Sequence, residues 1–205
     1  MNKNKQSVLK LTMMSTLLAI TIVLQAVASA FTMPITNTPV ALALIPIAVG
    51  AIIYGPECGG ILGLGWSLFI LVSGQADFYF GMNAVGTIVT VVSKGTLAGI
   101  FTGLVYNLIK KENYVVAIII ASIMTPLVNS LVYRLGLVVF FNEFFFGGAG
   151  NQNPVAYFMV AFVSVSFFVE LGISALFSPL IVRICDICFA KLGIPVQSKQ
   201  KNKVQ

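Results

Sequence analysis

Residues 114–141 read YVVAIIIASIMTPLVNSLVYRLGLVVFF, a long apolar stretch with a single charged residue, Arg134. A helix needs about 20 apolar residues to cross the hydrocarbon core of a bilayer, so this stretch predicts a transmembrane helix. The rest of the chain has the same character. Of its 205 residues, 58% are hydrophobic and only 9% are charged, whereas soluble domains carry about 25% charged residues. The sequence therefore predicts an integral membrane protein.

Composition and missing motifs exclude several activities. The chain has no histidine, which excludes histidine-based catalytic triads and histidine-ligated zinc or haem. It has no phosphate-binding loop of the G-x-x-x-x-G-K-[ST] type, no G-x-S-x-G motif and no H-E-x-x-H motif. The net charge of +6 comes from the chain ends and one short loop, not from a basic aromatic face. We therefore expect no enzyme activity, cofactor, metal or nucleic-acid partner.

Six apolar segments follow one another, separated by breaks that contain Pro, Gly, Asn or charged residues. We expect an all-α fold in which residues 1–205 form one membrane domain of six transmembrane helices. The second segment is short for a full crossing, and the sixth is long enough to tilt or to project from the bilayer. The predicted spans are about 8–31, 40–54, 57–73, 82–109, 114–141 and 154–190.

Lysine residues lie in only one set of connections, and this sets the expected orientation because positively charged loops stay in the cytoplasm. They precede the first span, join the fourth to the fifth or follow the sixth: Lys3, Lys5, Lys10, Lys110, Lys111, Lys191, Lys199, Lys201 and Lys203. The connections 32–39, 74–81 and 142–153 contain neither Lys nor Arg. We therefore predict that both termini are cytoplasmic.

The first segment also fits a secretory signal peptide. Its Lys-rich start, apolar stretch and Ala28-Ser29-Ala30 resemble the parts of such a peptide, including the cleavage site. We favour retention, because the apolar run from Val8 to Phe31 is longer than a usual signal-peptide core. The other five spans would keep their orientation in either case.

Ionisable side chains within a span are costly unless paired, so they point to function. At 1.5 Å of rise per residue, Lys94 lies roughly 18 Å and Glu170 roughly 24 Å below the outer ends of their spans, depths that allow the two to pair. Arg134 lies about 10 Å below its outer end, and no acidic residue occurs at that level within a span. A guanidinium there favours a carboxylate or phosphate ligand. The alternatives are that Arg134 pairs with Asp77 or Glu143 in the outer loops or reaches the lipid headgroups.

Neutral polar and aromatic residues occur around the level of Arg134, as a concave site for a small polar solute requires. Trp66, the only tryptophan, is expected to form a wall of the site or, equally, an anchor at the membrane interface. The predicted substrate-binding residues are Arg134, Lys94, Asn83, Asn129, Tyr133, Tyr79, Trp66 and Asn153.

Small residues recur four apart, a spacing that lets helices approach closely in lipid. Two such series occur in the third and fourth spans, at Gly59, Gly63, Gly95, Gly99 and Gly103. We expect these glycines to pack helices within the bundle. Ser15 and Ala19 form a similar pair on the first span, near its predicted cytoplasmic end, and are predicted to dock another membrane protein.

These features, with three short motifs, resemble the substrate-binding S component of energy-coupling factor (ECF) vitamin transporters. The motifs are ALIPIAVGAIIYGP at 43–56 followed by Gly59-Gly60, NAVGT at 83–87 and KGTLAG at 94–99. The resemblance covers about residues 10–190. It implies six spans with cytoplasmic termini in the cell membrane, and a solute-binding role.

The resemblance also implies a mechanism and partners. An S component binds its vitamin from outside and docks through small residues of its first helix onto a transmembrane coupling protein that carries two ATPases. The whole body is then thought to topple and release the solute inward. ATP hydrolysis by the partners agrees with the missing phosphate-binding loop. The pair Ser15 and Ala19 approximates the family's Ala-x-x-x-Ala pattern, with serine in place of the first alanine.

The favoured substrate is pantothenate, with riboflavin, a thiamine precursor and pyridoxine as alternatives. General likeness to pantothenate and thiamine-precursor binders, together with Arg134, leads to this choice. The carboxylate would contact Arg134 and Lys94, and the hydroxyl and amide groups would contact Asn83, Asn129 and Tyr133.

Three other functions stay open. A small secondary carrier or channel would transport without ATP and often shows internal repeats, but no convincing repeat relates residues 8–109 to 114–190. A membrane enzyme acting on lipid would need carboxylates or metal ligands near one interface, and the chain has only six acidic residues. A scaffold subunit without a ligand would be favoured if both Arg134 and Lys94 were internally paired.

Overall fold

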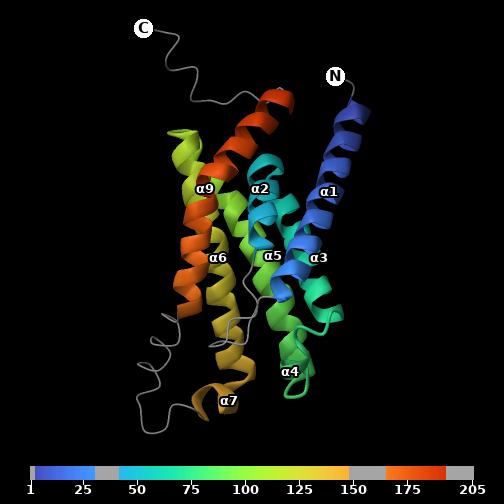
Figure 1. Ribbon diagram of the computed structural model, residues 1–205, viewed down its shortest axis with the longest axis vertical. Coiled ribbons are helices and arrows are strands. Elements are labelled where there is room, and N and C mark those ends of the chain that lie inside the picture. The colour runs from blue at the N-terminus through green and yellow to red at the C-terminus, as the bar shows by residue number, and fades with distance from the viewer. Residues whose placement is uncertain (1–2, 31–41, 148–164, 193–205) are drawn as a thin grey trace.

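Helices form nearly all of the regular structure in the computed structural model, which describes residues 3–30, 42–147 and 165–192 (Figure 1). No strand occurs in these residues, so the predicted all-α fold is confirmed. The helices are α1 (Lys3–Ser29), α2 (Leu44–Tyr54), α3 (Pro56–Val72), α4 (Asp77–Phe80), α5 (Ala84–Ile109), α6 (Tyr114–Phe140), α7 (Asn142–Gly147) and α9 (Val165–Leu192). Successive long helices run in opposite directions (Figure 1).

The long helices follow the predicted spans, and two asparagines show why α5 and α6 begin where they do. The side chain of Asn83 accepts a hydrogen bond from the Gly86 N–H, and that of Asn113 accepts from the N–H groups of Val115 and Val116. Such caps satisfy backbone donors that have no partner in the first helical turn. α2 begins at Leu44, later than the predicted 40. Residues 154–164 of the predicted sixth span lie outside the described residues.

Within residues 3–30, 42–147 and 165–192, four helices are long and apolar enough to cross a bilayer: the segments Val8–Ser29, Ala84–Ile109, Tyr114–Phe140 and Leu171–Cys188. The apolar helices α2 and α3 are shorter, with 11 and 17 residues. At 1.5 Å per residue, α2 covers only about half of a hydrocarbon core roughly 30 Å thick. The protein therefore passes the membrane several times, and the count of six crossings stays a prediction.

The ends of the helices sort the charged connections into two groups. The start of α1, the connection from α5 to α6 and the end of α9 lie at one end of the bundle, and α4 and α7 lie at the other (Figure 1). Lys110 and Lys111 belong to the first end, and the exposed acids Asp77 and Glu143 to the second. We call the second the outer end, following the prediction that it faces away from the cytoplasm.

Backbone-to-backbone packing joins α3 to α5, as the glycine series predicts. A Cβ atom added at Gly63 would clash with the carbonyl oxygen of Gly95, and one added at Gly99 would clash with the carbonyl oxygen of Gly59. The interface between these helices therefore has no room for a side chain at the contact points. The expectation that the glycines pack helices within the bundle is confirmed.

A one-residue connection folds α2 back onto α3. Gly55 has φ of 92°, a left-handed conformation that side chains rarely adopt. Pro56 then occupies the first turn of α3, where its missing N–H costs no hydrogen bond. This tight turn keeps α2 inside the bundle, where most of its residues are buried.

Two short helices lie where the sequence predicts loops. α4 and α7 fall in the connections 74–81 and 142–153. One or two helical turns do not repeat often enough to give a periodic hydrophobic signal, so sequence patterns cannot reveal them.

Candidate functional site

Four of the predicted substrate-binding side chains form one connected group in the outer half of the bundle. They come from α3, α4, α5 and α6. The ammonium of Lys94 lies 5.4 Å from the ring centroid of Trp66 and 5.1 Å from that of Tyr133. Both distances suit a cation–π attraction, which is worth about 0.5–2 kcal/mol. Tyr79 joins the group through a hydrogen bond of 2.6 Å between its hydroxyl and that of Tyr133.

Edge-to-face contacts hold the Tyr79 ring in this group. Its centroid lies 6.2 Å from that of Tyr133 and 5.4 Å from that of Phe141, with the ring planes steeply inclined. Aromatic pairs prefer this geometry, because the positive edge of one ring meets the negative face of the other. The short helix α4, which the sequence does not reveal, therefore brings Tyr79 over the end of α6.

Trp66 is buried inside the bundle, and its role as a wall of the site stays a prediction. Its side chain is only 2% exposed and packs in a cluster with Leu62, Ile70 and Val91. Its ring is covered on the interior side of the bundle, with the Lys94 ammonium near its face. The alternative of an interfacial anchor does not fit a side chain so fully covered by protein.

Arg134 is buried next to Tyr133 on α6. It is 7% exposed, and its Nη1 donates a hydrogen bond of 3.2 Å to the carbonyl oxygen of Ser130, one turn earlier in the helix. The loop acids Asp77 and Glu143, considered as its partners, are exposed. The guanidinium that the sequence analysis assigns to an anionic ligand thus lies inside the bundle, on the residue next to Tyr133.

Asn129 places a buried acceptor one turn deeper than Tyr133. The residue is 6% exposed, and its Oδ1 has no hydrogen-bond partner among the residues that the structure describes. Buried side-chain oxygens are nearly always paired, because leaving one without a donor costs about 1–3 kcal/mol. An oxygen of this kind is where a donor on a bound ligand would be stabilising.

Asn83 has a structural role at the start of α5. Its Oδ1 accepts from Gly86, and its Nδ2 donates to the carbonyl oxygen of Phe140 at 3.3 Å. Both polar ends of the side chain are therefore engaged, and binding of substrate by Asn83 stays a prediction. Asn153 lies outside the described residues, as does the side chain of Glu170, the predicted partner of Lys94.

Sequence reasoning missed Gln25 of α1. The residue is 2% exposed; its Oε1 accepts a hydrogen bond of 3.0 Å from Nε1 of Trp66, and its Nε2 donates at 2.7 Å to Oε1 of Gln75. A glutamine within an apolar span is itself a signal, because an amide in hydrocarbon needs partners. The sequence does not show which residues of the neighbouring helices provide these partners.

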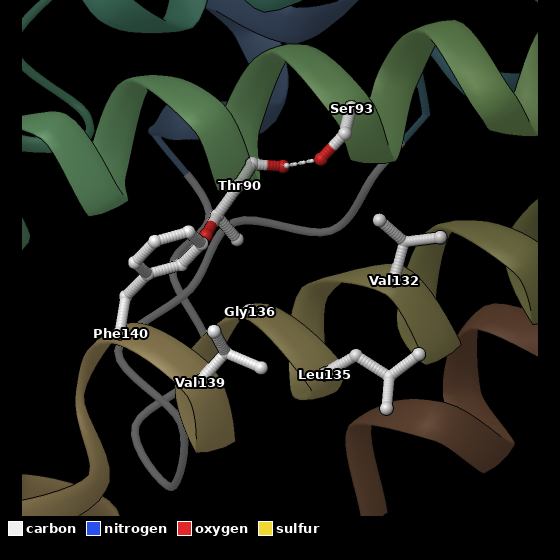
Figure 2. A pocket seen from close by; sticks show the side chains of 7 residues that line it. All are labelled: Thr90, Ser93, Val132, Leu135, Gly136, Val139 and Phe140. Atoms are coloured by element: carbon white, nitrogen blue, oxygen red, sulfur yellow. Dashed lines mark hydrogen bonds between the residues drawn. The ribbon is translucent and has the colours of Figure 1, made fainter.

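A separate groove lies between α5 and α6 (Figure 2). Its volume is about 190 Å³, and none of the predicted site residues lines it: its walls are Thr90, Ser93, Val132, Leu135, Gly136, Val139 and Phe140. Pockets for small molecules usually measure about 300–1,000 Å³ and contain several polar groups. This groove is smaller and mostly apolar, so it is a poor candidate for a polar solute.

Ser15 and Ala19 lie exposed on α1, as docking would require. The Ser15 hydroxyl donates to the carbonyl oxygen of Leu11 at 3.0 Å, within the same helix. The pair therefore presents a surface of small side chains, and the Ser15 hydroxyl is hydrogen-bonded within its own helix.

The described residues contain no group of three or more His, Cys, Asp or Glu side chains that could hold a metal ion. The three cysteines are free thiols; Cys58 and Cys185 are buried, and Cys188 is partly buried. The candidate site combines two cationic groups, hydroxyls, an amide and aromatic faces, which are the kinds of group that recognise a small polar solute.

Comparison with known proteins identifies one family. A family model described as "ECF transporter, substrate-specific component" matches residues 9–182. No curated protein and no solved structure matches the chain.

Proposed function

Because the chain belongs to the family of ECF-transporter substrate-specific components, we propose that it captures pantothenate at its outer end for import by ATP-hydrolysing partners. Membership makes the chain the substrate-binding membrane subunit of a transporter, not an enzyme, and a multi-pass protein of the cell membrane. The choice of vitamin, the site residues and the docking surface belong to the proposal.

The observation that supports the choice of ligand is the position of two cationic side chains in the outer half of the bundle. Arg134 is buried, and Lys94 is half-buried between two aromatic rings. Charges attract more strongly inside a protein than in water, because the surroundings screen them less. A solute with a carboxylate is therefore favoured over a neutral one, and a planar guanidinium suits that carboxylate.

Neutral groups near the cations fit the rest of pantothenate. Within the described part of the chain, the buried Oδ1 of Asn129 has no hydrogen-bond partner, so it would accept from an amide N–H or a hydroxyl of the ligand. The hydroxyls of Tyr133 and Tyr79 can each donate or accept. Trp66 and Tyr133 provide aromatic surface for the apolar part of the molecule.

The proposed partner is a transmembrane coupling protein that carries two ATPases. Ser15 and Ala19 are exposed on α1, the helix that packs only against α2 and α3 among the major helix contacts of the described residues. Small residues permit close contact between helices in lipid, where no hydrophobic force drives association. α1 therefore has a surface that another membrane helix can approach closely.

The ligand assignment is tested by equilibrium binding of radiolabelled pantothenate to the purified protein, comparing Arg134→Met with Arg183→Met. Both changes remove a guanidinium, but Arg183 is exposed on α9 near the opposite end. We expect the Arg134 variant to bind roughly 10–100-fold more weakly, as the loss of a charge-assisted hydrogen bond predicts. The Arg183 variant should bind like the wild type. Equal affinities for all three proteins would refute the charge argument.

Native mass spectrometry of the gently purified protein tests the vitamin directly. A co-purified molecule with the mass of pantothenate supports the proposal. A flavin, a pyrimidine or pyridoxine would replace pantothenate as the ligand without changing the role of the subunit.

A further inference from the structure

We infer that Gln25 is a positioning residue: from α1 it fixes the ring of Trp66 and, through that ring, the ammonium of Lys94. α1 thereby becomes part of the outer site, although none of its residues is among those predicted to contact the solute. That this site holds a solute rests on the proposed function, whereas the positioning of Trp66 by Gln25 does not.

The hydrogen bonds around Gln25 leave its amide one favourable orientation. The oxygen accepts from the indole N–H of Trp66, and the nitrogen donates to Gln75, whose own nitrogen donates to the hydroxyl of Ser73 at 2.9 Å. Turning the Gln25 amide over would set donor against donor at Trp66 and acceptor against acceptor at Gln75. The series from Ser73 to Trp66 therefore has a fixed direction.

Burial makes the bond between Gln25 and Trp66 important. Both side chains are 2% exposed, and in such a place an indole N–H without an acceptor pays a full desolvation cost. The bond therefore restricts rotation of the indole beyond what its apolar neighbours impose.

The orientation of the Trp66 ring matters because Lys94 interacts with its face. The ammonium lies 5.4 Å from the Trp66 centroid and 5.1 Å from the Tyr133 centroid. A cation is attracted to the face of a ring and not to its edge. A rotated indole would therefore shift the preferred position of the ammonium and, with it, the positive charge offered to an anionic ligand.

The remaining contacts of α1 are mostly apolar and do not fix the site. Leu17 and Leu18 pack next to Gly50 and Gly65, and the buried hydroxyl of Thr21 bonds to the carbonyl oxygen of Leu17 in its own helix. Thr21 is thus a matched control for Gln25. It is a buried polar residue one turn away whose side chain bonds only within α1.

The test uses Trp66 fluorescence, which belongs to one residue because the chain has a single tryptophan. In detergent, Gln25→Met should move the emission maximum to shorter wavelength, because the indole N–H loses its acceptor, and Thr21→Val should leave it unchanged. Lys94→Met should change the emission of the otherwise wild-type protein. In a protein that already carries Gln25→Met, the same Lys94→Met change should have a much smaller effect. The milder Gln75→Met, at a half-buried position, should give an intermediate shift even if Gln25→Met folds poorly.

The emission data decide the inference whether or not pantothenate is the ligand. Unchanged emission in both the Gln25 and Gln75 variants, or an effect of Lys94→Met that does not depend on Gln25, would overturn it. If the wild type binds pantothenate, Gln25→Met should also bind it roughly tenfold more weakly, because the change removes one hydrogen bond that holds Trp66 in place. If the emission shifts but the affinity does not fall, Gln25 orients Trp66 without affecting the site, which contradicts a role in positioning Lys94. A wild type that binds no pantothenate would contradict only the proposed ligand.

Discussion

Lys94 shows how one side chain can be both stable inside the bundle and useful there. A half-buried ammonium is costly in a membrane protein, and two ring faces within 5.4 Å offset part of that cost. Aromatic rings stabilise the charge without neutralising it. The two rings are neutral, so these contacts leave the positive charge of Lys94 in place.

This property predicts how the protein distinguishes a carboxylate from its neutral analogue. The wild type should bind pantothenate more tightly than panthenol, in which an alcohol replaces the carboxylate, and Lys94→Met should reduce that preference by about tenfold. Lys110→Met is the matched control, since Lys110 lies 5.6 Å from the ring of Tyr106 at the other end of the bundle. Competition binding measures both ratios, and a preference that Lys94→Met leaves intact contradicts a role for its charge.

Sequence reasoning identified the site residues by type and depth better than by contact. Lys94, Trp66, Tyr133 and Tyr79 form one group, although counting the rise per residue puts Lys94 deeper than Tyr133 and gives no depth for Tyr79, which lies in a connection. Asn83 precedes an apolar run, a position that predicts a helix cap as well as a ligand, and the structure shows the cap. Depth along a helix can be counted in the sequence, but the direction in which a side chain points depends on neighbouring helices.

At the scale of helices, glycine decides which pair is closest. α5 packs most extensively against α6 and α3, and on the α3 side the backbones touch at Gly59, Gly63, Gly95 and Gly99. On the α6 side, side chains meet instead, including a hydrogen bond of 2.8 Å between the hydroxyls of Thr102 and Thr125. The two faces of α5 are thus held by different means.

Gly63→Ala should destabilise the protein by about 1–3 kcal/mol, the usual cost of overpacking. The added methyl group meets the Gly95 carbonyl, which is backbone and cannot rotate away. Gly172→Ala is the control, because open space surrounds Gly172 on α9, where alanine should be neutral or slightly stabilising. Unfolding by SDS titration gives both values, and equal stabilities would show that α3 and α5 can separate at little cost.

The positions of the helices could be predicted from sequence because lipid imposes a simple rule: each crossing needs a long apolar run. That rule found the long helices, and the four-residue spacing of small residues predicted the glycine contacts between α3 and α5. It could not reveal α4, which has four residues, or decide whether α2 and α3 cross fully. A short helix can be apolar because protein surrounds it or because lipid surrounds it, and composition alone does not distinguish these two environments.

At the scale of the whole molecule, the proposed binding site and docking surface occupy different regions. Tyr79, Lys94 and Tyr133 belong to α4, α5 and α6, whereas Ser15 and Ala19 are exposed near the middle of α1. A change at one should therefore leave the direct contacts of the other intact.

Ala19→Trp should prevent co-purification of the coupling protein and ATP-dependent vitamin uptake while leaving solute binding unchanged, because a bulky ring blocks close helix contact. Ala175→Trp provides the control, since Ala175 is an exposed alanine on α9. Full uptake by the Ala19 variant would remove the docking assignment. Uptake into liposomes by this chain alone, without ATP, would favour a stand-alone carrier.

The glycine contacts between α3 and α5 also limit how a bound solute can leave. Where two backbones touch, no side chain can swing aside to make an opening, and any gap would require prying the two helices apart along their length. The backbone contacts between α3 and α5 therefore leave no exit path between these two helices. The protein must release its cargo elsewhere, by displacing a more loosely held peripheral helix such as α1 or by reorienting as a whole with the α3–α5 pair as its stiff part.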